Sequence, residues 1–166
     1  MRTELRSGKL NPVQKLNLIL SVLHLFERSE PEFAALVLKV SYLDGDVNFR
    51  EQMRTFTFDA LRPLMNDVIR EGMEDGSFFT RHPGSVGELL LMLGHDINDA
   101  VCRLLAQSPD DPACVIEILG LLDVYRDSAE MLIGAGFGKI NLFDVEHLLE
   151  AFRQTAEQLN LLKEGA

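Results

Sequence analysis

The sequence contains no tryptophan, only two cysteines and hardly any signal for β-strands. Cys102 and Cys114 do not form a CxxC pair and are too few for a disulfide framework, so we interpret them as reduced, buried thiols. No run of alternating Val, Ile or Thr appears, and no Asn-Gly or Asp-Gly pair joins two such runs. These absences argue against a sheet and predict an all-α fold.

Basic residues are also scarce, since 16 Lys and Arg stand against 26 Asp and Glu, for a formal net charge of -10. A surface of this average sign repels nucleic-acid phosphates and anionic lipids. Charged residues interrupt the apolar runs well before the roughly 18 residues of a membrane span, and Met1 to Glu4 do not open a signal peptide. We therefore expect a cytoplasmic chain that contacts neither a membrane nor, by itself, DNA.

The length of 166 residues fits one domain, 1–166, and the apolar periodicity divides it into six helices. Asn48 and Asn141 are the expected N-caps of the third and sixth helices, and Pro63 is expected to kink the third. Caps, prolines and glycines predict helices over residues 12–28, 29–44, 48–74, 85–107, 112–133 and from 141 onward.

The fourth predicted helix has a second stripe that is too apolar for a face in contact with solvent. This stripe consists of Glu88, Leu91, Met92, His95, Asp99 and Cys102. Its polar members are a conceivable metal-binding set, but only neighbours such as His95 and Asp99 could share an ion without help from another helix. A polar or interfacial stripe is the favoured interpretation, and the role of Glu88, His95, Asp99 and Cys102 stays open.

Motifs for catalysis or cofactor binding fail at defined positions. The segment Gly134 to Lys139 resembles a phosphate-binding loop, but Ile133 and Ile140 replace its first Gly and its Ser or Thr. A helix stop followed by a chain reversal is the better interpretation. No Glu-x-x-His pair, Ser-His-Asp set or Cys-His set can be assembled from neighbouring residues. We therefore expect no enzyme, no cofactor, no metal and no catalytic residue.

The segment Ala60 to Phe78 is more specific, because it contains the pattern Gly72-x-x-x-Gly76-x-Phe78, followed by Pro83 and a long helix. Gly72 would allow close packing, Gly76 a left-handed helix stop, and Phe78 an apolar plug. This stretch resembles the effector domain of the tetracycline-repressor (TetR) family of transcriptional regulators, and the helix order matches over about residues 12–135. The resemblance implies a ligand-binding and dimerisation domain.

In that family, a small and mostly apolar ligand enters a cavity between the helices and changes DNA binding by the complete repressor. The expected scarcity of buried basic residues favours a neutral, cationic or apolar ligand over a polyanion. His24 and Thr57 are the preferred candidates, since a polar group on an apolar stripe needs a partner. The candidate ligand-binding residues are Leu20, Leu23, His24, Val37, Tyr42, Met53, Phe56, Thr57, Ala60, Leu93 and Ile97.

The resemblance also implies a homodimer in which two long C-terminal helices of each subunit form a four-helix interface. The candidate interface residues are Leu91, Met92, Cys102, Leu119, Leu122 and Tyr125. Residues 1–11 could end the helix that leads from a helix-turn-helix domain, but they are too few to form that domain. We expect a fragment of a repressor, or else a stand-alone relative that does not bind DNA.

Two other classes of function are open on the sequence alone. A helical dimerisation or protein-interaction module without a small ligand would have a filled core and a large exposed apolar patch. A helical enzyme would need an acid, a base or a nucleophile that converge on one point, and the sequence shows none.

Overall fold

The computed structural model describes residues 9–21, 23 and 25–164, and these residues form only helices and their connections. The expected all-α fold is thus confirmed. The elements are α2 (Pro12–Ser21), α3 (Leu25–Arg28), α4 (Pro31–Leu38), the π-helix η1 (Lys39–Leu43), α5 (Val47–Glu74), α6 (Pro83–Gln107), α7 (Pro112–Ile133) and α8 (Val145–Glu164).

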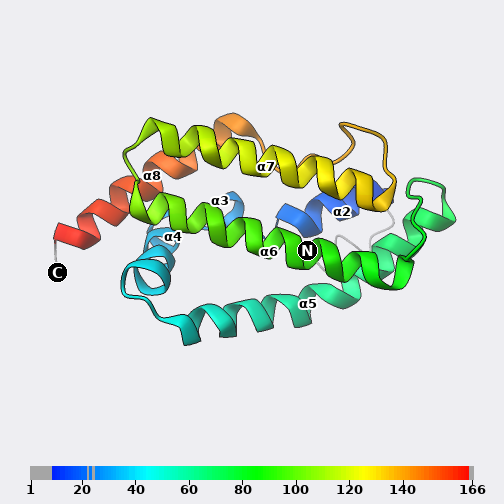
Figure 1. Ribbon diagram of the computed structural model, residues 1–166, viewed down its shortest axis with the longest axis horizontal. Helices are drawn as coiled ribbons and strands as arrows, with labels where there is room; N and C mark the ends of the chain where they lie inside the picture. Colours follow the sequence, from blue (N-terminus) through cyan, green and yellow to red (C-terminus); the bar gives the residue numbers. More distant parts are fainter. Residues whose placement is uncertain (1–8, 22, 24, 165–166) are drawn as a thin grey trace.

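The long helices α5, α6 and α7 lie roughly parallel to the long axis of the molecule, with α6 between the other two (Figure 1). Helix α2 packs against α5, whereas α4 packs against α8 at the other end of the bundle. Among the described helices, none combines the length and apolar composition needed to cross a membrane.

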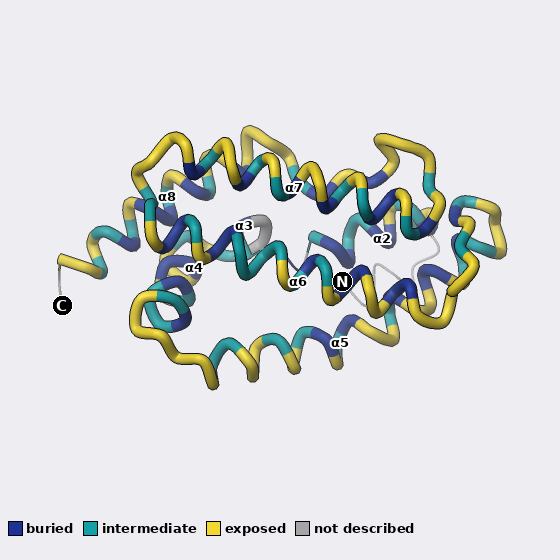
Figure 2. The backbone as a smooth tube through the Cα atoms, viewed as in Figure 1, coloured by how far each residue is buried: buried dark blue, intermediate teal, exposed yellow. Residues whose placement is uncertain are grey.

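The structure has two apolar cores, and each of them includes residues of both α6 and α7. The first joins α2, the second half of α5, the start of α6 and the end of α7, and includes Leu16, Met65, Leu90 and Tyr125. The second joins α3, α4, the end of α6, the start of α7 and α8. Residues 47–57 of α5 belong to neither core, and the start of α5 is largely exposed or half-buried in Figure 2. This leaves one side of that segment free to line a pocket.

Asp residues cap three of the long helices. Asp111 accepts a 2.9 Å hydrogen bond from the backbone N–H of Ala113 at the start of α7, as expected from Asp-Pro. The caps of α5 and α8 are Asp46 and Asp144, so the predictions of Asn48 and Asn141 were wrong. Both errors have the same cause. At each helix start an Asp and an Asn lie within a few residues of each other, both are good N-caps, and the geometry of the turn decides which of them caps the helix.

The first two predicted helices differ from the expectation. The predicted helix 12–28 is divided into α2 and α3, and the second ends in a π-helical turn in which the N–H of Asp44 donates to the carbonyl of Lys39 at 2.8 Å. In a π-helical turn the backbone hydrogen bonds join residues five apart, instead of four apart as in an α-helix, and such turns are frequent at functional sites. Here the turn brings the carbonyl of Ser41 to Arg50 of α5 and the hydroxyl of Tyr42 to Asp99 of α6.

The Gly72-x-x-x-Gly76-x-Phe78 motif has the structure that its spacing predicts. Gly76 has a φ of +80°, and the N–H of Phe78 donates to the carbonyl of Gly72 at 2.8 Å. A Cβ atom at Gly72 would overlap the ring of Phe78, which is buried. Gly72 therefore gives space to the plug, and Gly76 allows the reversal that brings the plug back.

The glycine-rich segment after α7 is a helix stop and a reversal, as expected. Gly134 ends α7 with a φ of +64°, and the buried carboxylate of Glu130 accepts hydrogen bonds from the N–H groups of Gly138 (3.0 Å) and Ile140 (2.9 Å). Backbone N–H groups of this loop thus donate to a carboxylate of the same chain, and the loop does not have the geometry of a phosphate-binding loop.

Candidate ligand-binding pocket

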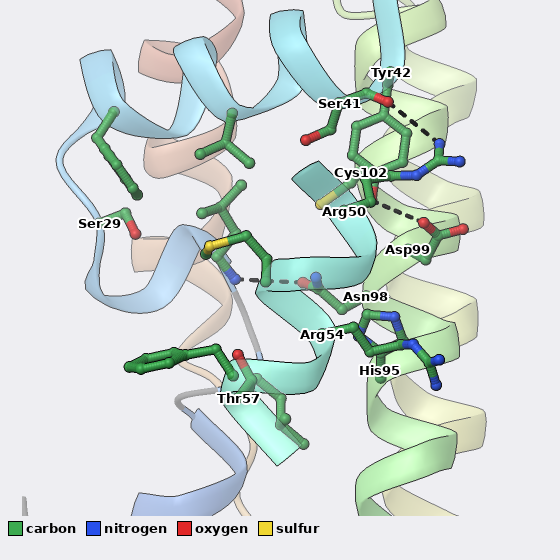
Figure 3. Close-up of a pocket in the computed structure, with 16 residues that line it drawn as sticks. Ser29, Ser41, Tyr42, Arg50, Arg54, Thr57, His95, Asn98, Asp99 and Cys102 are labelled. Carbon is green, nitrogen blue, oxygen red and sulfur yellow. Dashed lines mark hydrogen bonds between the residues drawn. The ribbon is translucent and has the colours of Figure 1, made fainter. Parts of the chain in front are cut away.

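A pocket of about 330 Å³ lies between α4, η1, the first half of α5 and the middle of α6 (Figure 3). This volume is at the lower end of the range for small-molecule sites. Its lining residues are Leu23, Leu25, Ser29, Phe33, Val37, Ser41, Tyr42, Arg50, Met53, Arg54, Phe56, Thr57, His95, Asn98, Asp99 and Cys102.

Polar side chains gather on the side of the pocket near α6, and Figure 3 shows them converging from η1, α5 and α6. The apolar lining residues with the most exposed surface lie on α4 and α5, and Phe33 and Phe56 are 49% and 74% exposed. We call the first group the polar wall: Tyr42, Arg50, Arg54, His95, Asn98 and Asp99. We call the second group the apolar wall: Phe33, Val37, Met53 and Phe56.

Among the described residues, Asp99 is the only carboxylate that lines the pocket, and both of its oxygens have hydrogen-bond donors. The hydroxyl of Tyr42 donates to Oδ1 at 2.9 Å, and Arg103 donates to Oδ2. Burial alone would raise the pKa of Asp99, but the hydrogen bonds from Arg103 and Tyr42 lower it below the ordinary value. Asp99 is therefore an ionised, neutralised carboxylate that fixes the position of Tyr42.

Arg50 lies close to the same turn, and its positive charge helps to lower the pKa of Asp99, although no carboxylate of the described residues forms an ion pair with it. Its Nη1 donates to the carbonyl of Ser41 at 3.3 Å, and its guanidinium carbon lies 5.2 Å from the centre of the Tyr42 ring. The second arginine of the polar wall, Arg54, donates to Glu51 at 3.1 Å and 2.8 Å. The two arginines therefore differ, because a carboxylate satisfies only Arg54.

Burial sets the protonation of the other titratable groups in the pocket. It raises the pKa of the Tyr42 hydroxyl, which stays protonated as a hydrogen-bond donor, and raises the pKa of the Cys102 thiol to about 12. A thiol with such a pKa is a poor nucleophile. Burial also lowers the pKa of His95, against the opposing effect of Asp96 and Asp99, which favours the neutral imidazole. These groups suit binding by hydrogen bonds and apolar contact.

Six of the predicted ligand-binding residues line this pocket: Leu23, Val37, Tyr42, Met53, Phe56 and Thr57. Leu20 is instead fully buried in the first core, and Ala60, Leu93 and Ile97 are partly buried away from the pocket. His24 lies outside the described residues. On α5, Met53, Phe56 and Thr57 line the pocket, whereas the apolar residues from Phe58 onward, such as Leu61 and Met65, lie in the first core.

The polar residues of the pocket were mostly missed. His95, Asp99 and Cys102 were noticed as one stripe, but as a weak metal-binding set with Glu88. In the structure Glu88 pairs with Arg62 at 3.1 Å, and no group of three or more potential metal ligands forms among the described residues. Buried basic residues are scarce, as expected, since Lys15 is the one that is buried among the described residues, but the half-buried Arg50 and Arg54 both line the pocket.

Four of the predicted interface residues need correction, since the chain already buries them by itself. Leu91 and Tyr125 are fully buried in the first core, and Cys102 and Leu122 lie in the second. Cys102 also lines the pocket. Of the other two, Met92 is 49% exposed and Leu119 is partly buried. Leu91 and Cys102 of the second stripe of α6 are thus covered within one subunit, whereas Met92 stays exposed.

Comparison with protein families, curated proteins and solved structures finds no match for the chain.

Proposed function

We propose that this chain is the effector-binding and dimerisation domain of a TetR-like transcriptional regulator. A small, amphipathic ligand would bind in the pocket, and in a complete regulator its binding would change the affinity of a helix-turn-helix domain for DNA. The observation that carries the proposal is the pocket itself, which combines an apolar wall with convergent hydrogen-bonding groups. The Gly72, Gly76 and Phe78 arrangement supports the comparison with that class of protein.

The pocket is suited to regulation because several elements meet there. The residues that line it come from α3, α4, η1, α5 and α6. A bound ligand therefore contacts several helices at once. A ligand changes a conformational equilibrium only through a difference in its affinity for the two states. Here such a difference would arise from the positions of α4 and η1 relative to α5 and α6, because the residues of the two walls lie on these four elements.

A homodimer is the second part of the proposal, and it requires a surface that shares only Met92 with the predicted one. Large apolar side chains are exposed on the neighbouring helices α6 and α7: Leu89, Met92, Ile116, Val124 and Met131. We call this set the α6/α7 face. Two antiparallel helices from each subunit would form a four-helix interface around a twofold axis. The same face supports the alternative of an interaction module without a ligand, so the pocket must be tested directly.

A thermal-shift screen with small hydrophobic and amphipathic compounds provides this test. A ligand at a hundred times its Kd stabilises the folded state by about 2.7 kcal/mol. For a chain of this length, that corresponds to an increase in Tm of roughly 5–10 °C.

Two matched variants show where such a ligand binds. Val37→Trp fills the pocket from α4 and should abolish the increase in Tm. Leu36→Trp changes the adjacent residue, which is 49% exposed and does not line the pocket, and should preserve it. An equal ligand response in both variants would place the ligand elsewhere and contradict the proposed function.

A further inference from the structure

We propose that the pocket binds a small uncharged ligand with one polar group, a carbonyl or hydroxyl oxygen that accepts a hydrogen bond from Ser41, and an apolar remainder that lies against the apolar wall. This inference rests on the proposed function and specifies the chemical class of the ligand. It depends on three features of the pocket: a buried hydroxyl without a partner, an apolar stripe that leads up to this hydroxyl, and charged groups that already neutralise one another.

The side chain of Ser41 is an unused hydrogen-bonding group in the lining of the pocket. It is 2% exposed, and its hydroxyl has no hydrogen-bond partner among the described residues. Arg50 donates to the backbone carbonyl of Ser41, and this bond leaves the hydroxyl unpaired. A buried hydroxyl without a partner is costly, so the binding of a ligand oxygen to it is favourable.

The Ser41 hydroxyl faces a different part of the pocket from the polar wall. In Figure 3 it points away from Arg50 and lies on the other side of the Tyr42 ring from the guanidinium. Phe33, Val37 and Ser41 follow one another at intervals of four residues along α4 and η1, and all three line the pocket. The hydroxyl therefore continues the apolar wall, and a ligand bound to it has apolar side chains along its remaining length.

The charged side chains at the pocket neutralise one another. Three arginines and three acids lie in the polar wall or beside it: Arg50, Arg54, Arg103, Glu51, Asp96 and Asp99. Arg54 forms an ion pair with Glu51. Arg103 pairs with Asp99, and the charge of Arg50 also helps to lower the pKa of this carboxyl group. A charged ligand would therefore lose its hydration without gaining a free counter-ion, and an uncharged ligand avoids this cost.

The apolar wall and the volume define the rest of the ligand. The exposed rings of Phe33 and Phe56 favour an apolar or aromatic body, since the burial of their surface against a ligand is favourable. A water molecule takes about 30 Å³ in the liquid, so a pocket of about 330 Å³ holds on the order of ten heavy atoms. Acetophenone, a phenyl ring with an uncharged carbonyl group, has this size and composition.

Four matched probes separate hydrogen bonding from charge. Acetophenone, isopropenylbenzene, benzoate and benzamidine share a phenyl ring, a planar substituent and the same number of heavy atoms. Isopropenylbenzene replaces the carbonyl oxygen of acetophenone with a CH₂ group, which accepts no hydrogen bond. Benzoate carries an anionic group of similar shape, and benzamidine carries a cationic one.

The test measures the Kd of the four probes by NMR titration for the wild-type chain and for two serine variants. Ser41→Ala removes the proposed hydrogen-bond donor and changes the volume of the pocket little. Ser85→Ala is the matched control, because Ser85 is exposed and outside the pocket. We expect the wild type to bind acetophenone at least about tenfold more tightly than benzoate or benzamidine, because only the two ions must be desolvated without a counter-ion.

Ser41→Ala should weaken the binding of acetophenone about fivefold, the contribution of one hydrogen bond, and leave the Kd of isopropenylbenzene unchanged. Ser85→Ala should bind both probes as the wild type does. The unchanged Kd of isopropenylbenzene shows that Ser41→Ala is folded. Without ligand, the Tm of Ser41→Ala should equal or exceed that of the wild type, because the substitution removes an unpartnered buried hydroxyl from a helical turn.

Other outcomes separate this inference from the proposed function. Tighter binding of benzoate or benzamidine than of acetophenone would overturn the uncharged ligand. An unchanged acetophenone Kd in Ser41→Ala, or an equal loss for isopropenylbenzene, would overturn the hydrogen bond from Ser41. In each of these cases the pocket remains a binding site. If none of the four probes binds or stabilises the wild type, both the inference and the proposed function are contradicted.

Discussion

The hydroxyl of Tyr42 donates a 2.9 Å hydrogen bond to Oδ1 of Asp99, and this bond joins η1 to α6 across the polar wall. Its acceptor is held in place by Arg103 on the next turn of α6. The π-helical turn thus has a fixed position, although η1 is short. The same bond orients the ring against which the guanidinium of Arg50 rests.

Tyr42→Phe should destabilise the chain by about 1–2 kcal/mol, because it leaves a partly buried carboxylate with one donor fewer. A double-mutant cycle with Asp99→Asn, followed by urea unfolding, measures the coupling between the two side chains. A coupling of zero would show that the hydrogen bond contributes nothing to stability.

His95 should make stability depend on pH in the mildly acidic range. Burial lowers its pKa in the folded chain below the ordinary value of 6.5, so between these two pKa values the unfolded chain binds more protons. Stability therefore rises with pH through this window and falls as the histidine is protonated. The free energy of unfolding of wild type and of His95→Gln, measured between pH 5 and 7, should rise more steeply for the wild type. Parallel curves would contradict this assignment.

Local signals explain which parts of the fold were predictable. The boundaries of α7 follow from Asp111-Pro112 and Gly134, and the reversal after α5 follows from Gly76 and Phe78. Each of these signals acts within a few residues, so it does not depend on the rest of the chain. Asp46 and Asp144 show the limit of such signals, because several good caps stood close together and the choice depended on the turn.

The burial of the apolar stripes on α6 and α7 was not predictable in the same way. Leu91 and Tyr125 are apolar positions on long helices, and an apolar stripe has the same pattern whether its own core or a second subunit covers it. The polar lining of the pocket was not predictable from the sequence pattern either. Arg50 lines it only because η1 folds back over the start of α5, and this depends on a π-helical turn that the sequence pattern did not indicate.

Gly94 allows α6 and α7 to approach closely. A Cβ atom at this position would collide with the hydroxyl of Tyr125 and lie 2.6 Å from Cδ1 of Leu23. Gly94→Ala should therefore lower stability by about 1–3 kcal/mol, as expected for overpacking of a core. Gly84→Ala is the control in the same helix, since no atom lies within 4 Å of the added methyl group, and it should be neutral or slightly stabilising. Thermal unfolding measures both variants, and equal Tm values for the two would contradict this role of Gly94.

The α6/α7 face gives the last prediction, which concerns the oligomeric state. If this face joins two copies, light scattering of the wild type gives twice the chain mass of 18.6 kDa. Val124→Glu should then give a folded monomer, because it places a charge within the apolar contact. Leu161→Glu is the control on α8, since Leu161 has the same exposed fraction of 61% and lies outside the face.

The buried neighbour Leu122 separates loss of the interface from loss of the fold. Leu122 is 2% exposed, so Leu122→Glu buries a charge in the second core and should unfold the chain. Far-UV circular dichroism distinguishes this result from the folded monomer expected for Val124→Glu. A wild-type chain that is monomeric at all concentrations, or a Val124→Glu variant that stays dimeric, would remove the α6/α7 face as the dimer interface.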